Sequence, residues 1–192
     1  EVFVFTLGLT ESWSNEATGC EYPMCPGTIA GKFNAKQHKF SAQSYDTVAS
    51  NLASVAELLR RANSNIKVLL TVSPVPLTAT NSGDHVLVAT SASKSILRAA
   101  AETARQELDF VDYFPSYEII ASPAFRGMFF QPNQRHVLQE GVDFVMKNFF
   151  DALDDTPLLS GDHESAAEVP LKSALDVQCD EELLAAFSKN EN

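Results

Sequence analysis

An apolar run at the start of the chain, residues 2–5 (Val-Phe-Val-Phe), limits the possible folds more than any other segment. A short continuous run of β-branched and aromatic residues is typical of a strand that is covered on both faces, as in a parallel sheet. Such sheets bind ligands beyond the carboxyl ends of their strands. The small and polar residues that follow, with Gly8, Thr10 and Glu11 among them, are therefore predicted to form a functional loop.

Further along the chain, helical and strand patterns alternate. Apolar residues at intervals of three and four predict helices, and short β-branched runs predict strands. One such helical stripe joins Val88, Ala92, Ile96, Ala99 or Ala100, and Thr103. In order, the predicted elements are a helix over 44–61, a strand over 66–72, a helix over 86–107, a strand over 110–114 and a helix over 138–150. This order predicts an α/β fold, a three-layer α/β/α arrangement with a mostly parallel sheet.

Two long segments between these elements are predicted to be loops. Residues 12–44 carry several glycines and prolines, and a loop of this length at a strand end is typical of a functional segment. Residues 121–135 form the second loop, which leads to His136. Ser116 and Glu118 come at the end of the third predicted strand, and we assign Glu118 to that strand.

The net charge of −11 is concentrated at the C-terminal end. Residues 151–192 hold eleven acidic residues against two lysines, which leaves 14 acidic and 12 basic residues in 1–150. Because nucleic-acid binding requires neutralised phosphates, this nearly neutral body argues against a nucleic-acid partner. We expect one domain over 1–150, an acidic linker over 151–170, and a tail over 171–192 that forms an amphipathic helix or binds a partner.

The cysteines and the hydropathy bear on the compartment. Cys20, Cys25 and Cys179 are odd in number and lack zinc-finger spacing, which favours reduced thiols in a cytoplasmic protein, although Cys20 and Cys25 have the alternative of a disulfide or a shared metal. No run of about 18 apolar residues is present, so we expect no membrane partner. We also expect no metal and no cofactor.

Glu1 stands immediately before the first predicted strand. We therefore expect the sequence to begin inside a domain, so that the fold is incomplete at its N-terminus and a first strand with its loop lies upstream.

Polar groups from the strand ends are predicted to meet at one rim of the sheet. His136 reaches this rim on a loop before the last helix, where an imidazole can act as a general base near neutral pH. The alternative for His136 is a capping or surface role.

Several segments resemble the GSCFA family. They are 4–13 (Val-Phe-Thr-Leu-Gly-Leu-Thr-Glu-Ser-Trp), 22–28 (Tyr-Pro-Met-Cys-Pro-Gly-Thr), 70–77 (Leu-Thr-Val-Ser-Pro-Val-Pro-Leu), 93–95 (Ser-Lys-Ser), 113–119 (Tyr-Phe-Pro-Ser-Tyr-Glu-Ile) and 135–137 (Arg-His-Val). The resemblance covers roughly residues 1–150. That family is similar to the SGNH, or GDSL-like, hydrolases, whose α/β/α domains cleave or transfer acyl groups on oxygen.

The resemblance implies roles for particular residues. Where SGNH hydrolases have Gly-x-Asn-Asp, this chain has residues 8–11, so Thr10 takes the place of the oxyanion donor and Glu11 holds the long loop or a substrate hydroxyl. Where they have Asp-x-x-His, this chain has Asn133 and His136, with His136 as the base. Ser116 and Glu118 are assigned to substrate binding or to buttressing of the rim.

The nucleophile that the resemblance implies lies in a Gly-Ser-Cys-Phe-Ala segment, which does not occur in this sequence. Candidate substitutes are Ser12, Ser14, Ser73 and Ser116, but none has the setting of a nucleophile elbow, and hydrogen bonding or capping is the simpler role for each. We therefore expect an upstream serine, and this chain alone to be inactive.

The sequence leads to one main hypothesis and two rivals. The main hypothesis is an esterase or O-acyltransferase that acts on a small-molecule or carbohydrate ester. The first rival is a binding module that keeps the hydrolase fold without the chemistry, because Thr10 and Asn133 depart from the SGNH pattern. The second is a flavodoxin-like phosphate-binding domain, which lacks support from a Gly-rich loop that opens a helix. The sequence does not indicate an oligomeric state.

Overall fold

A computed structural model describes residues 1–22 and 24–154. The chain divides into two compact units. Of the described residues, the first unit contains 1–11 and 42–152, and the second contains 12–41 with 153 and 154. The linker predicted over 151–170 lies outside the described residues from residue 155 onwards, and the tail predicted over 171–192 lies wholly outside them.

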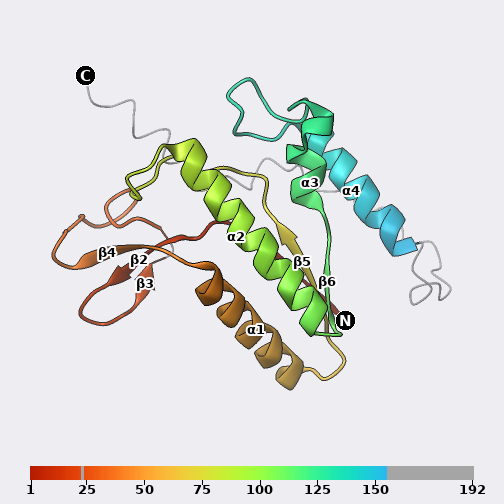
Figure 1. Cartoon of the computed structure of the whole chain (residues 1–192), viewed down its shortest axis with the longest axis horizontal. Helices are drawn as coiled ribbons and strands as arrows, with labels where there is room; N and C mark the ends of the chain where they lie inside the picture. The colour runs from red at the N-terminus through yellow and green to blue at the C-terminus, as the bar shows by residue number, and fades with distance from the viewer. Residues whose placement is uncertain (23, 155–192) are drawn as a thin grey trace. The chain divides into compact units, whose positions relative to one another are not determined.

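A parallel three-stranded sheet forms the centre of the first unit. Its strands are β1 (Val2–Leu7), β5 (Lys67–Val72) and β6 (Val111–Tyr113), in the order β1-β5-β6 (Figure 1). Val2 of β1 pairs with Lys67 of β5, and Val68 of β5 pairs with Val111 of β6. The predicted α/β fold with a parallel sheet is confirmed.

β5 is the buried strand of this sheet, and β1 lies at its edge. Leu70 and Val72 of β5 are at most 1% exposed, whereas Val2 and Val4 of β1 are 54% and 51% exposed. The prediction that the first strand is buried on both faces is therefore wrong for this structure. Its composition suits a central strand, but only β5 pairs with it in the described residues.

Two helices cover one face of the sheet. α1 (Tyr45–Ala62) begins at Ser44, whose hydroxyl accepts the Thr47 N–H as an N-cap, and Val48, Leu52 and Ala56 form its buried stripe. α2 (Val86–Glu107) packs on β5, β6 and α1. Both helices match their predicted ranges within one residue at each end.

The buried face of α2 coincides with the predicted one only at Ala100, which is fully buried. Val88 is 57% exposed, and the buried positions lie one residue further along: Ala89, Ser93, Lys94, Leu97, Ala100, Ala101 and Ala104. Small residues fill both possible stripes of this helix, so the 3.6-residue period alone did not separate them.

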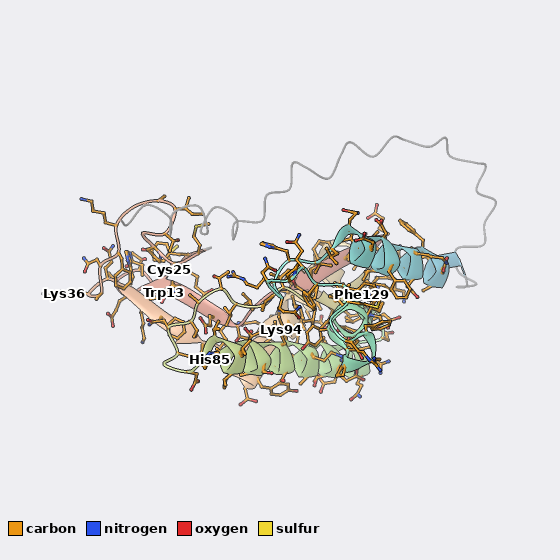
Figure 2. All side chains as sticks on the ribbon, turned by 90° about the horizontal axis from the view of Figure 1, so that it is seen from above. Trp13, Cys25, Lys36, His85, Lys94 and Phe129 are labelled. Carbon is orange, nitrogen blue, oxygen red and sulfur yellow. The ribbon has the colours of Figure 1, made fainter. Side chains whose placement is uncertain are left out.

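The C-terminal elements of the first unit are α3 (Ser116–Ala121), the 3₁₀ turn η1 (Pro123–Phe125) and α4 (Gln139–Asp154). Seen from above, α2 and α4 lie on opposite sides of the strands (Figure 2). Phe114 at the end of β6 meets Phe149 of α4 edge to face, at 5.2 Å between ring centroids. Two expectations need correction: Glu118 lies on α3 instead of a strand, and the last helix continues past residue 150.

The segment predicted as a long loop contains a small sheet in the order β3-β2-β4. Its strands are β2 (Glu11–Asn15), β3 (Glu21–Tyr22) and β4 (His38–Ala42). Trp13 packs edge to face against Phe33 and Phe40, at 5.5 and 5.4 Å between centroids. This aromatic cluster supplies apolar contacts within the segment.

No helix in the described part of the chain is both long and apolar enough to cross a membrane.

Candidate functional site

The residues after β1 are held by two neighbouring side chains of α2. Ser93 Oγ accepts the Thr10 N–H at 2.8 Å, and Lys94 Nζ donates to the Gly8 carbonyl at 2.8 Å. Thr10, Ser93 and Lys94 are all buried, at 5%, 1% and 2% exposure. The Gln43 N–H donates to the Thr10 carbonyl at 2.9 Å. We call residues 8–10 with these partners the β1-end clamp.

The clamp uses the N–H of Thr10 but not its hydroxyl. The Thr10 N–H is already used by Ser93, so an oxyanion would have to take the Thr10 hydroxyl instead. Within the described residues that hydroxyl has no hydrogen bond, and no buried side-chain oxygen there lacks a partner, so it keeps access to solvent. The oxyanion role of Thr10 stays a prediction, and this hydroxyl is the group that would have to fill it.

Glu11 contacts a different segment from the one expected. Its Oε1 accepts a short hydrogen bond from the Thr80 hydroxyl, and Thr80 also bonds Ser82 at 2.8 Å. Both partners lie between β5 and α2. Glu11 thus holds the segment that leads from β5 into α2.

Ser116 is occupied by hydrogen bonds to the end of β5. Its Oγ donates to the Val72 carbonyl at 3.0 Å and forms a short hydrogen bond with the Thr71 hydroxyl. These contacts tie α3 to the sheet. They favour the structural role for Ser116 over that of a nucleophile, since the hydroxyl is already engaged.

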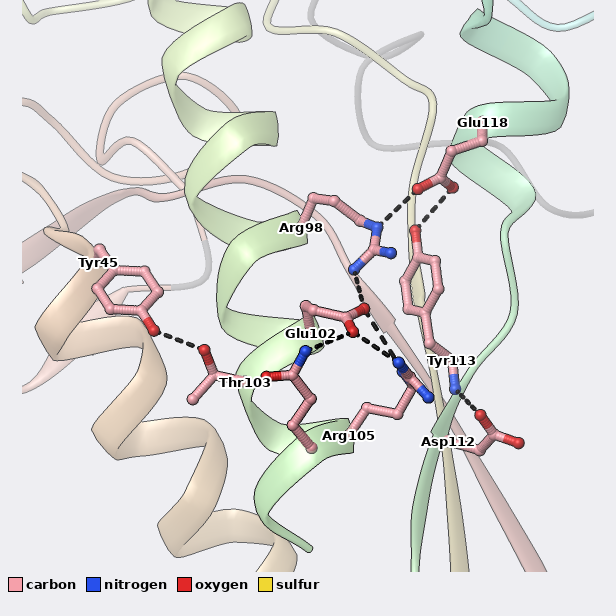
Figure 3. A network of polar contacts seen from close by, with 9 residues as sticks. Tyr45, Arg98, Glu102, Thr103, Arg105, Asp112, Tyr113 and Glu118 are labelled. Atoms are coloured by element: carbon pink, nitrogen blue, oxygen red, sulfur yellow. Dashed lines mark hydrogen bonds and ion pairs between the residues drawn. The ribbon is translucent and has the colours of Figure 1, made fainter.

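Glu118 belongs to a polar network that joins α2 to α3 (Figure 3). It accepts from Arg98 Nε at 2.7 Å and from the Tyr113 hydroxyl at 2.9 Å, and the Arg98 guanidinium stacks 4.1 Å from the centre of the Tyr113 ring. Burial and the hydrogen bond to Glu118 raise the pKa of Tyr113. This arrangement supports a buttressing role for Glu118.

Glu102 extends the network along α2. It binds Arg105 at 2.6 Å and Arg98 at 3.0 Å (Figure 3). Hydrogen bonds from Arg105 and Arg98 lower the pKa of Glu102 from 4.5 to about 2. The carboxylate therefore stays charged well into the acid range.

His136 is oriented by Asn133 through a local hydrogen-bonded turn. Asn133 Oδ1 accepts the backbone N–H groups of Arg135 and His136, at 3.0 and 3.2 Å. The Nδ2 group of Asn133 then faces His136 Nδ1 at 2.7 Å. Because an amide nitrogen can only donate, Nδ1 accepts and the proton of the neutral imidazole lies on Nε2.

The predicted site residues form separate contact groups. Gly8 and Thr10 bind α2, Glu11 binds Thr80, Ser116 binds β5, and Glu118 binds Arg98 and Tyr113. Among the described residues, no hydrogen bond joins Asn133 or His136 to any of the others.

The other candidate serines are also placed. Ser12 and Ser14 lie on β2, and the Ser73 hydroxyl accepts the Val75 N–H at 3.2 Å.

Sequence reasoning missed the function of Ser93 and Lys94, which hold the β1 end. A signal was present, because a lysine at position 94 aligns with Leu97, Ala101 and Ala104 at helical spacing. A charge on an apolar stripe indicates a buried and partnered group.

The fold and these contacts define an α/β domain with polar groups fixed at the carboxyl end of an edge strand. The model of the GSCFA family matches residues 1–149, and the chain belongs to that family. Comparison with curated proteins and with solved structures gives no match.

Proposed function

We propose that this GSCFA domain supplies part of an SGNH-like esterase or O-acyltransferase site, acting on an ester of a carbohydrate-type alcohol. A serine upstream of Glu1 would attack the acyl carbonyl, forming the Ser Oγ–C bond while His136 takes the hydroxyl proton. The C–O bond to the alcohol then breaks, and His136 returns the proton to the leaving oxygen. Water or a second alcohol releases the acyl group in the same way.

The observation that carries this proposal is the β1-end clamp. Oxyanion stabilisation requires donors that are fixed before the reaction, because reorganisation would consume the gain. Three main-chain groups in residues 8–10 are held at 2.8–2.9 Å, while the Thr10 hydroxyl keeps solvent access. One such donor typically contributes about 2.7–4 kcal/mol in the transition state.

The edge of β1 supports the expected upstream segment. An exposed apolar edge strand readily pairs with another strand. Val2, Phe3 and Val4 are 54%, 39% and 51% exposed, and a groove of about 360 Å³ lies beside the strand, lined in part by Phe5, Gly8 and Leu52. An upstream strand on this edge would bring its following residues towards Gly8 and Thr10.

The orientation of His136 sets a requirement for catalysis. A general base must present an unprotonated nitrogen, whereas the Asn133 amide leaves the proton on Nε2. To use Nε2 as the base, the amide must turn so that its oxygen accepts from Nδ1. That turn gives up the two hydrogen bonds from Arg135 and His136 to Asn133 Oδ1.

The same observation favours a second candidate, a binding module without catalysis. In the orientation described, Nε2 of His136 is a donor that suits a ligand oxygen. The two candidates therefore differ at Nε2 of His136. In the enzyme this nitrogen accepts a proton, whereas in the binding module it donates a hydrogen bond to the ligand.

Hydrolysis of short p-nitrophenyl esters by the protein with its upstream residues tests the proposal. We expect activity that His136→Ala abolishes and His85→Ala, a histidine at the start of α2, leaves intact. Asn133→Asp should raise the activity, since one carboxylate oxygen can hold the backbone N–H groups while the other accepts from Nδ1. The absence of hydrolysis, or hydrolysis that survives His136→Ala, would contradict the proposed enzymatic activity.

A further inference from the structure

Lys94 places its amino group inside the first unit. It lies in the middle of α2 and is 2% exposed, and it extends from the helix towards the strands (Figure 2). Burial of an ammonium group is costly unless acceptors compensate it. Here one compensating acceptor is the main-chain carbonyl of Gly8, an exposed residue 86 positions earlier.

A hydrogen bond to a carbonyl oxygen affects the whole peptide group. The Gly8 carbonyl and the Leu9 N–H belong to the same peptide, so a charged donor on the oxygen withdraws electron density and strengthens the N–H as a donor. Hydrogen bonds in such chains reinforce one another. Ser93 holds the next peptide by its N–H instead, which uses up that donor.

The Leu9 N–H is available to a ligand. In the described part of the chain, Leu9 donates no hydrogen bond through its amide. A Cβ built on Gly8 would meet no atom within 4 Å, so the space beside this peptide is open. Gly8 and Leu9 also line the groove beside β1.

We infer that Lys94 is a positioning residue which polarises the Gly8–Leu9 peptide, so that the Leu9 N–H binds the oxyanion or carboxylate of an acyl group. The inference rests on the proposed function for its ligand, and it adds a second donor to the Thr10 hydroxyl. It also explains why α2 carries a lysine beside Ser93: the serine ties the loop, and the lysine adds charge.

Titration of the ¹⁵N-labelled full chain with sodium acetate tests this inference by NMR. The Leu9 amide proton should move downfield saturably, while the Thr10 amide, already bonded to Ser93, should move little. This comparison needs no variant, so it holds even if substitution of a buried lysine prevents folding. An unmoved Leu9 amide would overturn the inference.

Three substitutions separate charge from tethering. Lys94→Arg keeps the charge and should retain the Leu9 response, whereas Lys94→Gln keeps a neutral donor and should weaken acetate binding about tenfold or more. Lys94→Met removes both charge and donor and should weaken binding at least as much. Ser95→Ala, an exposed neighbour, is the matched control and should leave acetate binding unchanged. Equal acetate binding by Lys94→Gln and the parent would contradict polarisation by charge.

The acetate titration and the ester assay fail independently. Acetate binding at Leu9 needs no nucleophile, so its loss overturns the role of Lys94 alone. Acetate binding without ester hydrolysis overturns the proposed reaction and leaves the anion site intact.

Discussion

The β1-end clamp and the loop that carries His136 are built in opposite ways. In the clamp, residues 83 and 86 positions apart meet in a buried setting through Ser93 and Lys94. In the loop, Asn133 binds residues two and three positions away, and it is exposed. The clamp depends on the packing of α2 against the sheet, whereas the loop is organised by its own sequence.

This difference separates a fixed part of the candidate site from an adjustable one. Moving the β1 end would leave buried donors and acceptors unpaired, which costs far more than the exchange of an exposed hydrogen bond for water. Turning the Asn133 amide exchanges exposed bonds. The proposed oxyanion donors are thus preorganised, and the proposed base is the part that has to adjust.

The largest stability effect is expected at the clamp. Ser93→Ala leaves the buried Thr10 N–H without its acceptor and should lower the free energy of unfolding by about 1–3 kcal/mol. Urea denaturation measures this change. Ser95→Ala on the exposed side of the same helix should change it by less than about 0.5 kcal/mol. Equal changes in the free energy of unfolding for Ser93→Ala and Ser95→Ala would show that the clamp does not stabilise the fold.

A smaller loss is expected where the His136 loop meets α4. A Cβ on Gly141 would lie 2.9 Å from Phe129 Cβ and 3.0 Å from Val137 Cγ1. We expect overpacking in Gly141→Ala to cost about 1–3 kcal/mol, against a helix-propensity gain of about 1 kcal/mol. Thermal unfolding should therefore show a net loss, while Gly8→Ala, with open space beside it, should show none. A stabilised Gly141→Ala variant would show that the loop is free of α4.

Asn133→Ala should cost less again, about 0.5–1 kcal/mol, because the lost hydrogen bonds are exposed. Its clearer effect is on the imidazole. In the parent chain, ¹⁵N shifts of the His136 ring should show the proton on Nε2, and Asn133→Asp should move it to Nδ1. A parent ring already protonated on Nδ1 would reverse the orientation of the Asn133 amide.

The smallest effect is expected in the polar network of Arg98, Glu102 and Glu118, which joins α2 to α3. The pKa of Glu102 is lowered from 4.5 to about 2, so its charged form favours the folded state above pH 4.5. That contribution disappears as the pH falls from 4.5 to 2. Melting temperatures of Glu102→Gln and the parent should differ slightly at pH 6 and converge near pH 2. A gap that persists at pH 2 would show that the carboxylate charge is not its source.

The sequence predicted best what depends on local pattern. The ranges of α1, α2 and β5 follow from apolar periodicity and short β-branched runs, and the Asn133–His136 pair is implied by the resemblance to the Asp-x-x-His segment of SGNH hydrolases. The position of β1 at the edge depends on which strands are present to pair with it. The strands in 12–41 depend on contacts of Trp13 with rings up to 27 positions away, which no local window contains.

The clamp could not be predicted for the same physical reason. Its two hydrogen bonds to α2 require the register of that helix on the sheet, and the choice of stripe in an alanine- and serine-rich helix depends on tertiary packing. Only the lysine at position 94 marked the correct face. A buried charge among small apolar residues carries more information about the fold than the alanines around it.

Fluorophosphonate labelling of the protein with its upstream residues tests the central claim most directly, because the probe reacts with an activated serine. The account predicts one labelled serine upstream of Glu1, with labelling lost in His136→Ala and reduced in Thr10→Val, whereas Thr10→Ser keeps it. The absence of labelling, or labelling that is independent of both His136 and Thr10, would contradict it.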